Sequence, residues 1–172
     1  QPFEALERQH SELLEHYHLG VLRGELTLDQ ARFARFSDLL AHYGAAAAPV
    51  ADLLVLYRQT YLASEQVIPG AVALLERLRA AGLKTGLITN NVTVEQLGKL
   101  KRLGLEALFD VVVISESAGF AKPDPRIFAL ALAQLGCVAD EVVMVGDSWS
   151  ADVQGAHAAG IRAIWLNRSG RA

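Results

Sequence analysis

The chain has 172 residues, of which 52% are apolar and 20% charged, so its composition predicts a packed globular fold rather than disorder. The net charge of −3, without any run of lysine and arginine, argues against nucleic acid or an anionic membrane as the main partner. The single cysteine excludes an internal disulfide and a cysteine-based zinc site. No apolar run approaches a membrane span and no secretory signal opens the sequence, so we expect a cytoplasmic protein. The sequence leaves open whether it is a monomer or a homodimer.

The first part of the chain, residues 1–66, predicts helices only. Apolar residues recur at helical spacing in three segments, at 3–18, 28–43 and 50–61. Thr27 and Gln30 have the spacing of a capping box at the start of the second segment, and Pro49 suits the start of the third. We therefore expect an all-helical domain over residues 1–66.

From residue 67 onward, short apolar strands alternate with amphipathic helices. Strands are expected at 84–89, 111–115, 142–145 and 162–166, and helices at 71–81, 93–103, 125–135 and 150–159. Thr93 and Gln96 are expected to cap the second of these helices, while Asp124 and Pro125 suit the N-cap and first residue of the third. Such alternation predicts a parallel sheet covered on both faces, and therefore an α/β fold over residues 67–172.

Polar side chains follow three of these strands, at the end where ligands bind in open parallel sheets. They are Thr89, Asn90 and Asn91 after the first strand, Lys122 shortly after the second, and Asp147 and Asp152 after the third. A hydroxyl, backbone N–H groups at a helix N-terminus and a lysine suit the oxygens of a phosphoryl group. Carboxylates repel phosphate, so two of them beside such a group imply a bridging hard cation, for which magnesium fits.

The two acids of this set are expected to differ in role. Asp147 directly follows a strand and is expected to bind Mg²⁺ itself, whereas Asp152, farther along, would hold a metal-bound water or orient its neighbours. Glu116 is interpreted as a structural partner of Lys122 rather than a site acid. Trp149 stands between the two aspartates and either lines the site or packs beneath the loop.

Three stretches resemble the second, third and fourth motifs of the haloacid dehalogenase superfamily of phosphatases: LITNN (87–91), AKPDP (121–125) and VGDSWSAD (145–152). The resemblance covers the whole chain, because residues 1–66 look like the helical cap that this superfamily inserts after its first motif. The stretches GELTLDQARFARFSDLL (24–40) and VIPGAVALLERLR (67–79) are similar to the branch that includes pyrimidine 5′-nucleotidases. The resemblance implies a Rossmann-like parallel sheet core over residues 67–172 and an all-helical cap domain over residues 1–66.

The resemblance also implies a role for each polar residue. The phosphate-binding set would be Thr89, Asn90, Asn91 and Lys122. Thr89 would bind the transferring phosphoryl group and Lys122 would steady both it and the nucleophile. Asp147 would hold Mg²⁺, and Asp152 would support the metal site. The implied protein is a magnesium-dependent phosphoric monoester hydrolase of a small phosphorylated metabolite, for which nucleoside 5′-monophosphates are the first candidates.

One part of the implied chemistry is not found in these residues. The family's nucleophile and its general acid–base form an Asp-x-Asp pair at the end of the first strand, and no two aspartates here stand two positions apart. The apolar strand expected before the cap, and a further strand and helix expected after Gly170, are also missing from the sequence. We therefore expect the nucleophile that forms the aspartyl phosphate to lie on a segment outside this chain. The 172 residues by themselves would then be inactive.

Two other functions fit part of the pattern. A haloacid dehalogenase shares the fold but displaces halide without a metal, so it would have no task for Asp147. A catalytically inactive binding module of the same fold would explain the absent Asp-x-Asp pair. It would not explain why Thr89, Lys122 and Asp147 are all present.

Overall fold

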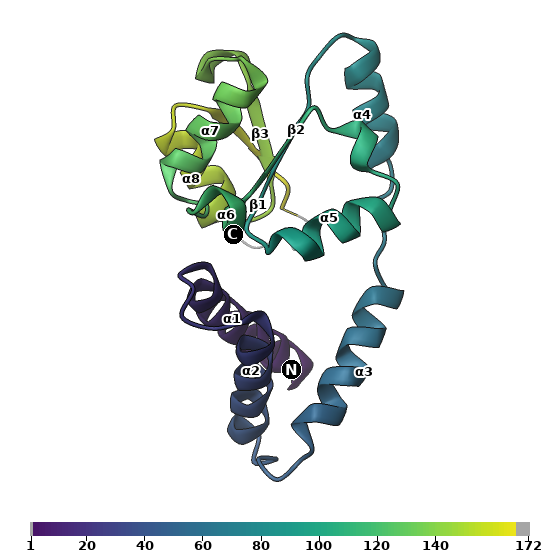
Figure 1. Ribbon diagram of the computed structural model, residues 1–172, viewed down its shortest axis with the longest axis vertical. Coiled ribbons are helices and arrows are strands. Elements are labelled where there is room, and N and C mark those ends of the chain that lie inside the picture. Colours follow the sequence, from purple (N-terminus) through teal and green to yellow (C-terminus); the bar gives the residue numbers. More distant parts are fainter. Residues whose placement is uncertain (1, 168–172) are drawn as a thin grey trace. The chain divides into compact units, whose positions relative to one another are not determined.

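The structure of the protein, a computed structural model, describes residues 2–167. The chain divides into two compact units, one of residues 1–66 and one of residues 67–172. The described part of the first unit contains only helices, while the second unit alternates short parallel strands with helices (Figure 1). The predicted combination of a helical part with an α/β part is thus confirmed. No helix within residues 2–167 is long and apolar enough to cross a membrane.

The helices of the first unit follow the periodicity of the sequence. They are α1 (Pro2–Leu22), α2 (Leu28–His42) and α3 (Val50–Ala63). The capping box of α2 is confirmed, because Thr27 Oγ1 accepts a hydrogen bond from the backbone N–H of Gln30 at 3.2 Å and Gln30 Oε1 accepts one from Thr27 N at 2.9 Å. Helix α2 packs against both α1 and α3. Its buried residues are Ala31, Arg35, Phe36 and Leu39.

The second unit contains the predicted alternation of elements. It begins with α4 (Ala71–Ala80), β1 (Gly86–Thr89) and α5 (Thr93–Arg102). Next come the short helix η1 (Glu106–Leu108), β2 (Val111–Ile114), α6 (Ser115–Ala118) and α7 (Pro125–Leu135). The short helix η2 (Ala139–Glu141) leads to β3 (Val143–Gly146), the π-helical turn η3 (Trp149–Gln154), α8 (Gly155–Ala158) and β4 (Arg162–Trp165).

The strands pair in parallel, as predicted, but they form two separate two-stranded sheets among the described residues. Strand β1 pairs with β2, with Thr89 opposite Ile114, and β3 pairs with β4, with Gly146 opposite Trp165. The predicted parallel sheet is thus interrupted among these residues: β1 does not pair with β3, and each of the four strands has one edge without a strand partner. Val143 and Val145 of β3 are accordingly 47% and 55% exposed, although their apolar run predicts burial.

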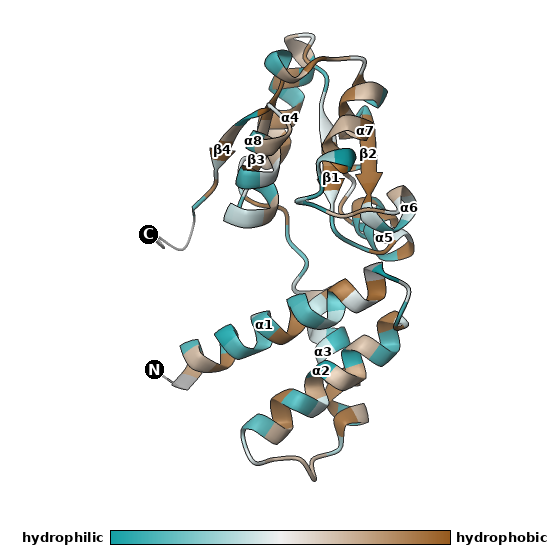
Figure 2. Ribbon diagram, turned by 90° about the vertical axis from the view of Figure 1, so that its left-hand side faces the viewer, coloured by the Kyte–Doolittle hydropathy of each residue, from teal (hydrophilic) through white to brown (hydrophobic). Residues whose placement is uncertain are grey.

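Helix α7 lies at the centre of the hydrophobic core of the second unit. Its residues Ile127 and Phe128 are completely buried, and it contacts β1, β2 and α8. Because α8 also packs against β4, these two helices connect the two sheets. The predicted start of α7 is confirmed: Asp124 accepts a hydrogen bond from Arg126 N at 2.9 Å, and Pro125 is the first helical residue. Strand β2 is hydrophobic along its length (Figure 2), as expected for a strand beneath a helix.

Two details of the predicted helices are wrong, although α5 begins at residue 93 as predicted. Thr93 is the first residue of α5 rather than its cap, because Val92 takes the cap position with an extended backbone. Gln96 is buried and does not close a capping box. The helix predicted at 150–159 begins instead as the turn η3, and its continuation α8 packs closely on α7. A Cβ at Gly155 would lie 2.9 Å from two ring carbons of Phe128, so only glycine fits there without a shift.

Candidate active site

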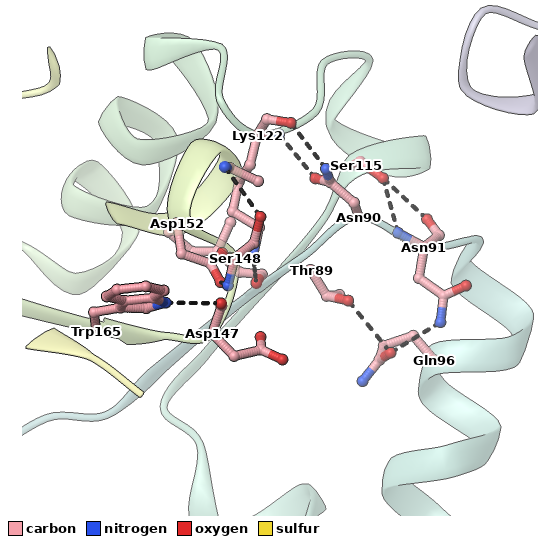
Figure 3. A network of polar contacts seen from close by, with 12 residues as sticks. Thr89, Asn90, Asn91, Gln96, Ser115, Lys122, Asp147, Ser148, Asp152 and Trp165 are labelled. Carbon is pink, nitrogen blue, oxygen red and sulfur yellow. Dashed lines mark hydrogen bonds and ion pairs between the residues drawn. The ribbon is translucent and has the colours of Figure 1, made fainter. Parts of the chain in front are cut away.

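Lys122 joins the carboxyl ends of β1 and β3. Its Nζ donates to the carbonyl oxygen of Ile88 at 2.9 Å and to Oδ1 of Asp152 at 2.6 Å (Figure 3). Ile88 immediately precedes Thr89 at the end of β1, and Asp152 lies in η3, shortly after β3. The side chains of Lys122 and Asp152 are only 11% and 6% exposed, so they form a buried ion pair. The structure therefore brings together, around the ammonium group of Lys122, the three stretches that resemble the family motifs, residues 87–91, 121–125 and 145–152.

Asp152 is fixed on its other side by the loop that follows β3. Its Oδ2 accepts a hydrogen bond from Ser148 N at 2.9 Å, and Ser148 Oγ accepts one from Ala151 N at 3.2 Å at the start of η3. Position 146 must be glycine, because a Cβ at Gly146 would collide with the side chain of Asp152. Asp152 thus binds both Lys122 and the loop on which Asp147 lies.

Asp147 has a different environment from Asp152. Its side chain is exposed, and its carboxylate makes no hydrogen bond to any residue that the structure describes. Its backbone carbonyl oxygen accepts a hydrogen bond from Trp165 Nε1 at 3.0 Å (Figure 3). The rings of Trp149 and Trp165 lie 5.0 Å apart, and Trp149 is 51% exposed, so it does not pack beneath the loop. The indole of Trp165 therefore holds the backbone of Asp147 while the carboxylate stays open to solvent.

Thr89 ends β1 with its hydroxyl beside α5. Thr89 Oγ1 donates a long hydrogen bond of 3.5 Å to Gln96 Oε1, which also accepts one from Asn91 Nδ2 at 3.0 Å. Asn91 Oδ1 in turn accepts a hydrogen bond from Val92 N at 2.8 Å. The amide of Asn91 therefore fixes the start of α5, and the Thr89 hydroxyl lies at the junction of β1 and this helix.

Asn90 faces the segment that carries Lys122. Its Oδ1 accepts a hydrogen bond from Lys122 N at 2.8 Å, and its Nδ2 donates one to Lys122 O at 2.9 Å (Figure 3). Of the residues predicted to bind phosphate, the structure thus brings Asn90 and Lys122 into direct contact and holds both next to Thr89.

Glu116 does not pair with Lys122, so that interpretation is wrong. Its Oε2 accepts a hydrogen bond from Thr93 N at 2.8 Å, at the first turn of α5. This bond, together with one from the Thr93 side chain, lowers the pKa of the Glu116 carboxyl. Asp152 takes the place beside Lys122 because η3 directs its carboxylate there. Glu116 instead stabilises the N-terminus of α5, where a negative charge is favourable.

The donors after β3 fit a hard cation but do not surround one. Asp147 offers two carboxylate oxygens, whereas both oxygens of Asp152 already accept hydrogen bonds. Within residues 2–167, no group of three or more His, Cys, Asp and Glu side chains could hold a metal ion by itself. Magnesium keeps several waters and commonly takes only one or two carboxylates besides substrate oxygens. The donor set therefore fits a magnesium ion bound chiefly through Asp147.

Gln96 and Trp165 are parts of the site that the sequence did not reveal. The sequence predicts Gln96 as a helix cap. In the structure its side chain is buried and accepts a hydrogen bond from the Thr89 hydroxyl. Trp165 ends β4, and the pairing of β4 with β3 brings its indole N–H to Asp147. The position of Trp165 at a strand end was the one available signal, since no motif contains it.

Residues 3–160 match the haloacid dehalogenase-like hydrolase family. The chain is 39% identical over 114 residues to a glyceraldehyde 3-phosphate phosphatase from Methanothermobacter thermautotrophicus, a match that covers 66% of this chain and 50% of that protein. It is 45% identical over 101 residues to the pyrimidine 5′-nucleotidase YjjG from Escherichia coli, covering 58% of this chain and 44% of that one. The chain thus spans about half the length of the curated relatives that it matches.

Among solved structures, the chain is similar to YfnB from Bacillus subtilis, a HAD-type protein crystallised with bound magnesium. The TM-score is 0.78 at 28% sequence identity, and the match covers 97% of this chain and 74% of that one. This likeness confirms the predicted Rossmann-like α/β core with a helical part.

Proposed function

Because the chain belongs to the haloacid dehalogenase-like hydrolase family, we propose that it carries most of the active site of a magnesium-dependent phosphatase acting on a small phosphomonoester. The observation that carries this proposal is the position of the Lys122 ammonium between the ends of β1 and β3. An ammonium has three N–H donors, and within the described residues its bonds to Ile88 and Asp152 leave one for an anion. A largely buried cation with a remaining donor suits a phosphoryl oxygen.

Each side chain of the site has its own task in this proposal. The hydroxyl of Thr89 donates to an oxygen of the transferring phosphoryl group, and Lys122 offsets the charge on that group. Positioning and charge stabilisation account for most of the catalysis of phosphoryl transfer, so these two contacts are the ones that matter most. Asp152 holds the Lys122 ammonium in place through their ion pair. It does not bind the phosphate itself, because a carboxylate repels an anion.

Asp147 would hold the magnesium ion. Its exposed carboxylate is accessible to a cation, and the hydrogen bond from Trp165 fixes the backbone from which that carboxylate extends. When bound, Mg²⁺ would neutralise charge on the phosphoryl oxygens, which allows carboxylates to stand beside them. Asp152 would orient the loop on which Asp147 lies, through Ser148.

The nucleophile in this proposal lies on a segment outside the 172 residues. An aspartate would attack phosphorus and release the alcohol, forming an aspartyl phosphate that water then hydrolyses. Strands β1 and β3 each have an unpaired edge within the described residues, and Val145 and Ile164 remain 55% and 56% exposed on the second sheet. An apolar strand that pairs with β1 and β3 would satisfy the backbone groups of both edges, extend the apolar surface to which Val145 belongs, and place the residues at its carboxyl end near Thr89 and Asp147.

The helical unit, residues 1–66, would act as a cap that excludes water and selects the substrate. The two relatives named above act on a triose phosphate and on pyrimidine nucleotides, according to their names. Nucleoside 5′-monophosphates and triose phosphates are therefore the first substrates to try. Both are small monoesters, as the proposal requires.

Phosphate release by the complete gene product, measured across a panel of phosphomonoesters, tests this proposal. We expect turnover of at least one of them with Mg²⁺ and none after chelation. Asp147→Asn should lower the magnesium-dependent rate by about 100-fold or more, because changes to groups that merely support a metal ligand already cost 10- to 100-fold. The matched control is Asp140→Asn, an exposed acid just before β3 at the opposite end of the strand, which should keep the wild-type rate.

Two outcomes would overturn the proposal. One is turnover that survives both chelation and Asp147→Asn. The other is release of halide from a 2-haloacid with no phosphatase activity on any ester, which would make the protein a dehalogenase.

A further inference from the structure

The segment that carries Lys122 has no regular structure to hold it. It lies between α6, which ends at Ala118, and α7, which begins at Pro125, and Lys122 itself is in a turn. The next residue, Pro123, has no N–H group with which to anchor the chain. A catalytic ammonium must nevertheless be held precisely, because a misplacement of about 1 Å can cost 100-fold in rate. Within the turn, one backbone hydrogen bond, from Asp124 N to the carbonyl oxygen of Ala121 at 2.8 Å, spans Lys122, and it binds neither the N–H nor the carbonyl group of Lys122 itself.

The side chain of Asn90 binds both of these groups. Its amide oxygen accepts from the backbone N–H of Lys122 at 2.8 Å, and its amide nitrogen donates to the backbone carbonyl of the same residue at 2.9 Å. The donor and the acceptor of one planar amide thus bind the donor and the acceptor of one residue, 32 positions away in the sequence. Such a two-point contact restricts both the position and the rotation of the Lys122 backbone.

The far end of the lysine is held by the same strand end. Lys122 Nζ donates to the carbonyl oxygen of Ile88 at 2.9 Å. Ile88 and Asn90 are the two neighbours of Thr89 in the chain. One strand end therefore holds the backbone of Lys122 through Asn90 and its ammonium through Ile88. This arrangement fixes the ammonium relative to the Thr89 hydroxyl.

We propose that Asn90 is a positioning residue, which sets the ammonium of Lys122 against the hydroxyl of Thr89 and does not itself bind the phosphoryl group. The inference rests on the proposed phosphatase function and replaces the expectation that Asn90 is a phosphate ligand. It makes a specific claim about coupling: Asn90 acts on the rate only through Lys122.

A double-mutant cycle on kcat of the complete gene product tests this claim. Asn90→Ala should lower kcat by about 10- to 100-fold with a smaller change in KM, because Lys122 is then poorly placed in the transition state. In a Lys122→Met background the same substitution should change kcat by less than about twofold, since contacting residues in one network are not additive. The matched control is Asn91→Ala, whose side chain binds Val92 and Gln96, so its effect should persist in the Lys122→Met background.

Circular dichroism of each variant shows whether it folds. If Asn90→Ala does not fold, Asn90→Leu replaces it, because leucine keeps about the same size, removes both hydrogen bonds to the Lys122 backbone and adds no charge. If Lys122→Met does not fold, Lys122→Gln replaces it, because it lacks the ammonium and keeps an N–H donor for the buried Asp152 carboxylate. An effect of Asn90 that is equally large with and without the lysine amine would overturn the inference while leaving the phosphatase function intact. A wild-type protein without turnover on any ester would overturn both.

Discussion

At the scale of single residues, the two aspartates of the fourth motif have separate physical roles. Asp152 is buried and binds Lys122 and Ser148, so its charge stabilises the arrangement of the site. Asp147 is exposed, and its carboxylate has no hydrogen-bond partner among the described residues, so its charge is available to a cation. The expected division between a direct ligand and a supporting acid stays a prediction, which the contrast in burial favours.

This contrast predicts opposite effects on stability. Asp152→Asn should lower the free energy of unfolding by about 3–5 kcal/mol, because it leaves the Lys122 ammonium buried without a compensating charge. Asp147→Asn should change it by less than about 0.5 kcal/mol, as is usual for an exposed side chain without contacts. Urea denaturation of the two variants beside the wild type measures both values. Equal destabilisation by the two substitutions would contradict the assignment of the buried pair.

The sequence could predict which residues gather at the site but not how their side chains use their donors. Thr89, Lys122 and Asp147 follow strand ends, so the parallel topology alone brings them to one edge. Asn90 follows a strand end too, yet nothing in the sequence shows that its amide binds the backbone of Lys122. The direction of a side chain depends on tertiary contacts, which spacing along the chain does not encode.

At the scale of elements, the helices of the first unit bury a positive charge among aromatic rings. Arg35 of α2 is 4% exposed, and its guanidinium carbon lies 4.8 Å from the ring centre of Phe36 and 5.3 Å from that of Tyr57. The rings of Phe36 and Tyr57 meet edge-on, with centroids 4.9 Å apart. His10 of α1 lies 5.8 Å and 6.0 Å from the same two rings. Cation–π contacts compensate part of the cost of burying Arg35.

This cluster predicts a pH dependence of stability. Burial, followed by the positive charge of Arg35, lowers the pKa of His10 below its ordinary value of 6.5. As the pH falls below 6.5, His10 becomes protonated in the unfolded chain, while in the folded protein it stays neutral to a lower pH. Protonation therefore favours the unfolded chain, and the free energy of unfolding decreases as the pH falls. His10→Phe keeps an aromatic ring but removes this titration. Melting temperatures between about pH 7.5 and 5.5 should therefore fall less steeply for the variant than for the wild type.

If the melting temperatures of wild type and His10→Phe fall with pH at the same slope, the prediction is wrong, because the pKa of His10 would then be the same in the folded and unfolded chain.

Elements were easiest to predict where a local contact decides the boundary. The capping box of Thr27 and Gln30 and the Asp124 cap involve residues two or three positions apart, so the sequence contains the whole interaction. The turn η3 could not be predicted in the same way. The residue that follows it, Gly155, packs against Phe128 of another helix, and this tertiary contact is not visible in the sequence.

At the scale of the whole molecule, the strands of the described residues form two separate pairs rather than one sheet. No two aspartates in these 172 residues stand two positions apart, so the sequence predicts a phosphatase site without its nucleophile. The structure has two parallel strand pairs rather than one sheet, with unpaired edges at β1 and β3 in the described residues. Unpaired edges of this kind readily accept another strand. Their presence supports the proposal that the nucleophile arrives on a segment outside these residues.

The central claim is that the ends of β1 and β3, together with the segment before α7, form one site for a phosphoryl group and a magnesium ion. A crystal structure of the complete gene product with Mg²⁺ and tungstate, which mimics phosphate, tests it most directly, because tungsten can be located by its anomalous scattering. We predict a tungstate within about 2.5–3.2 Å of both Thr89 Oγ1 and Lys122 Nζ, with Mg²⁺ bound to the Asp147 carboxylate. Tungstate bound away from Thr89 and Lys122, or magnesium bound without Asp147, would contradict the account.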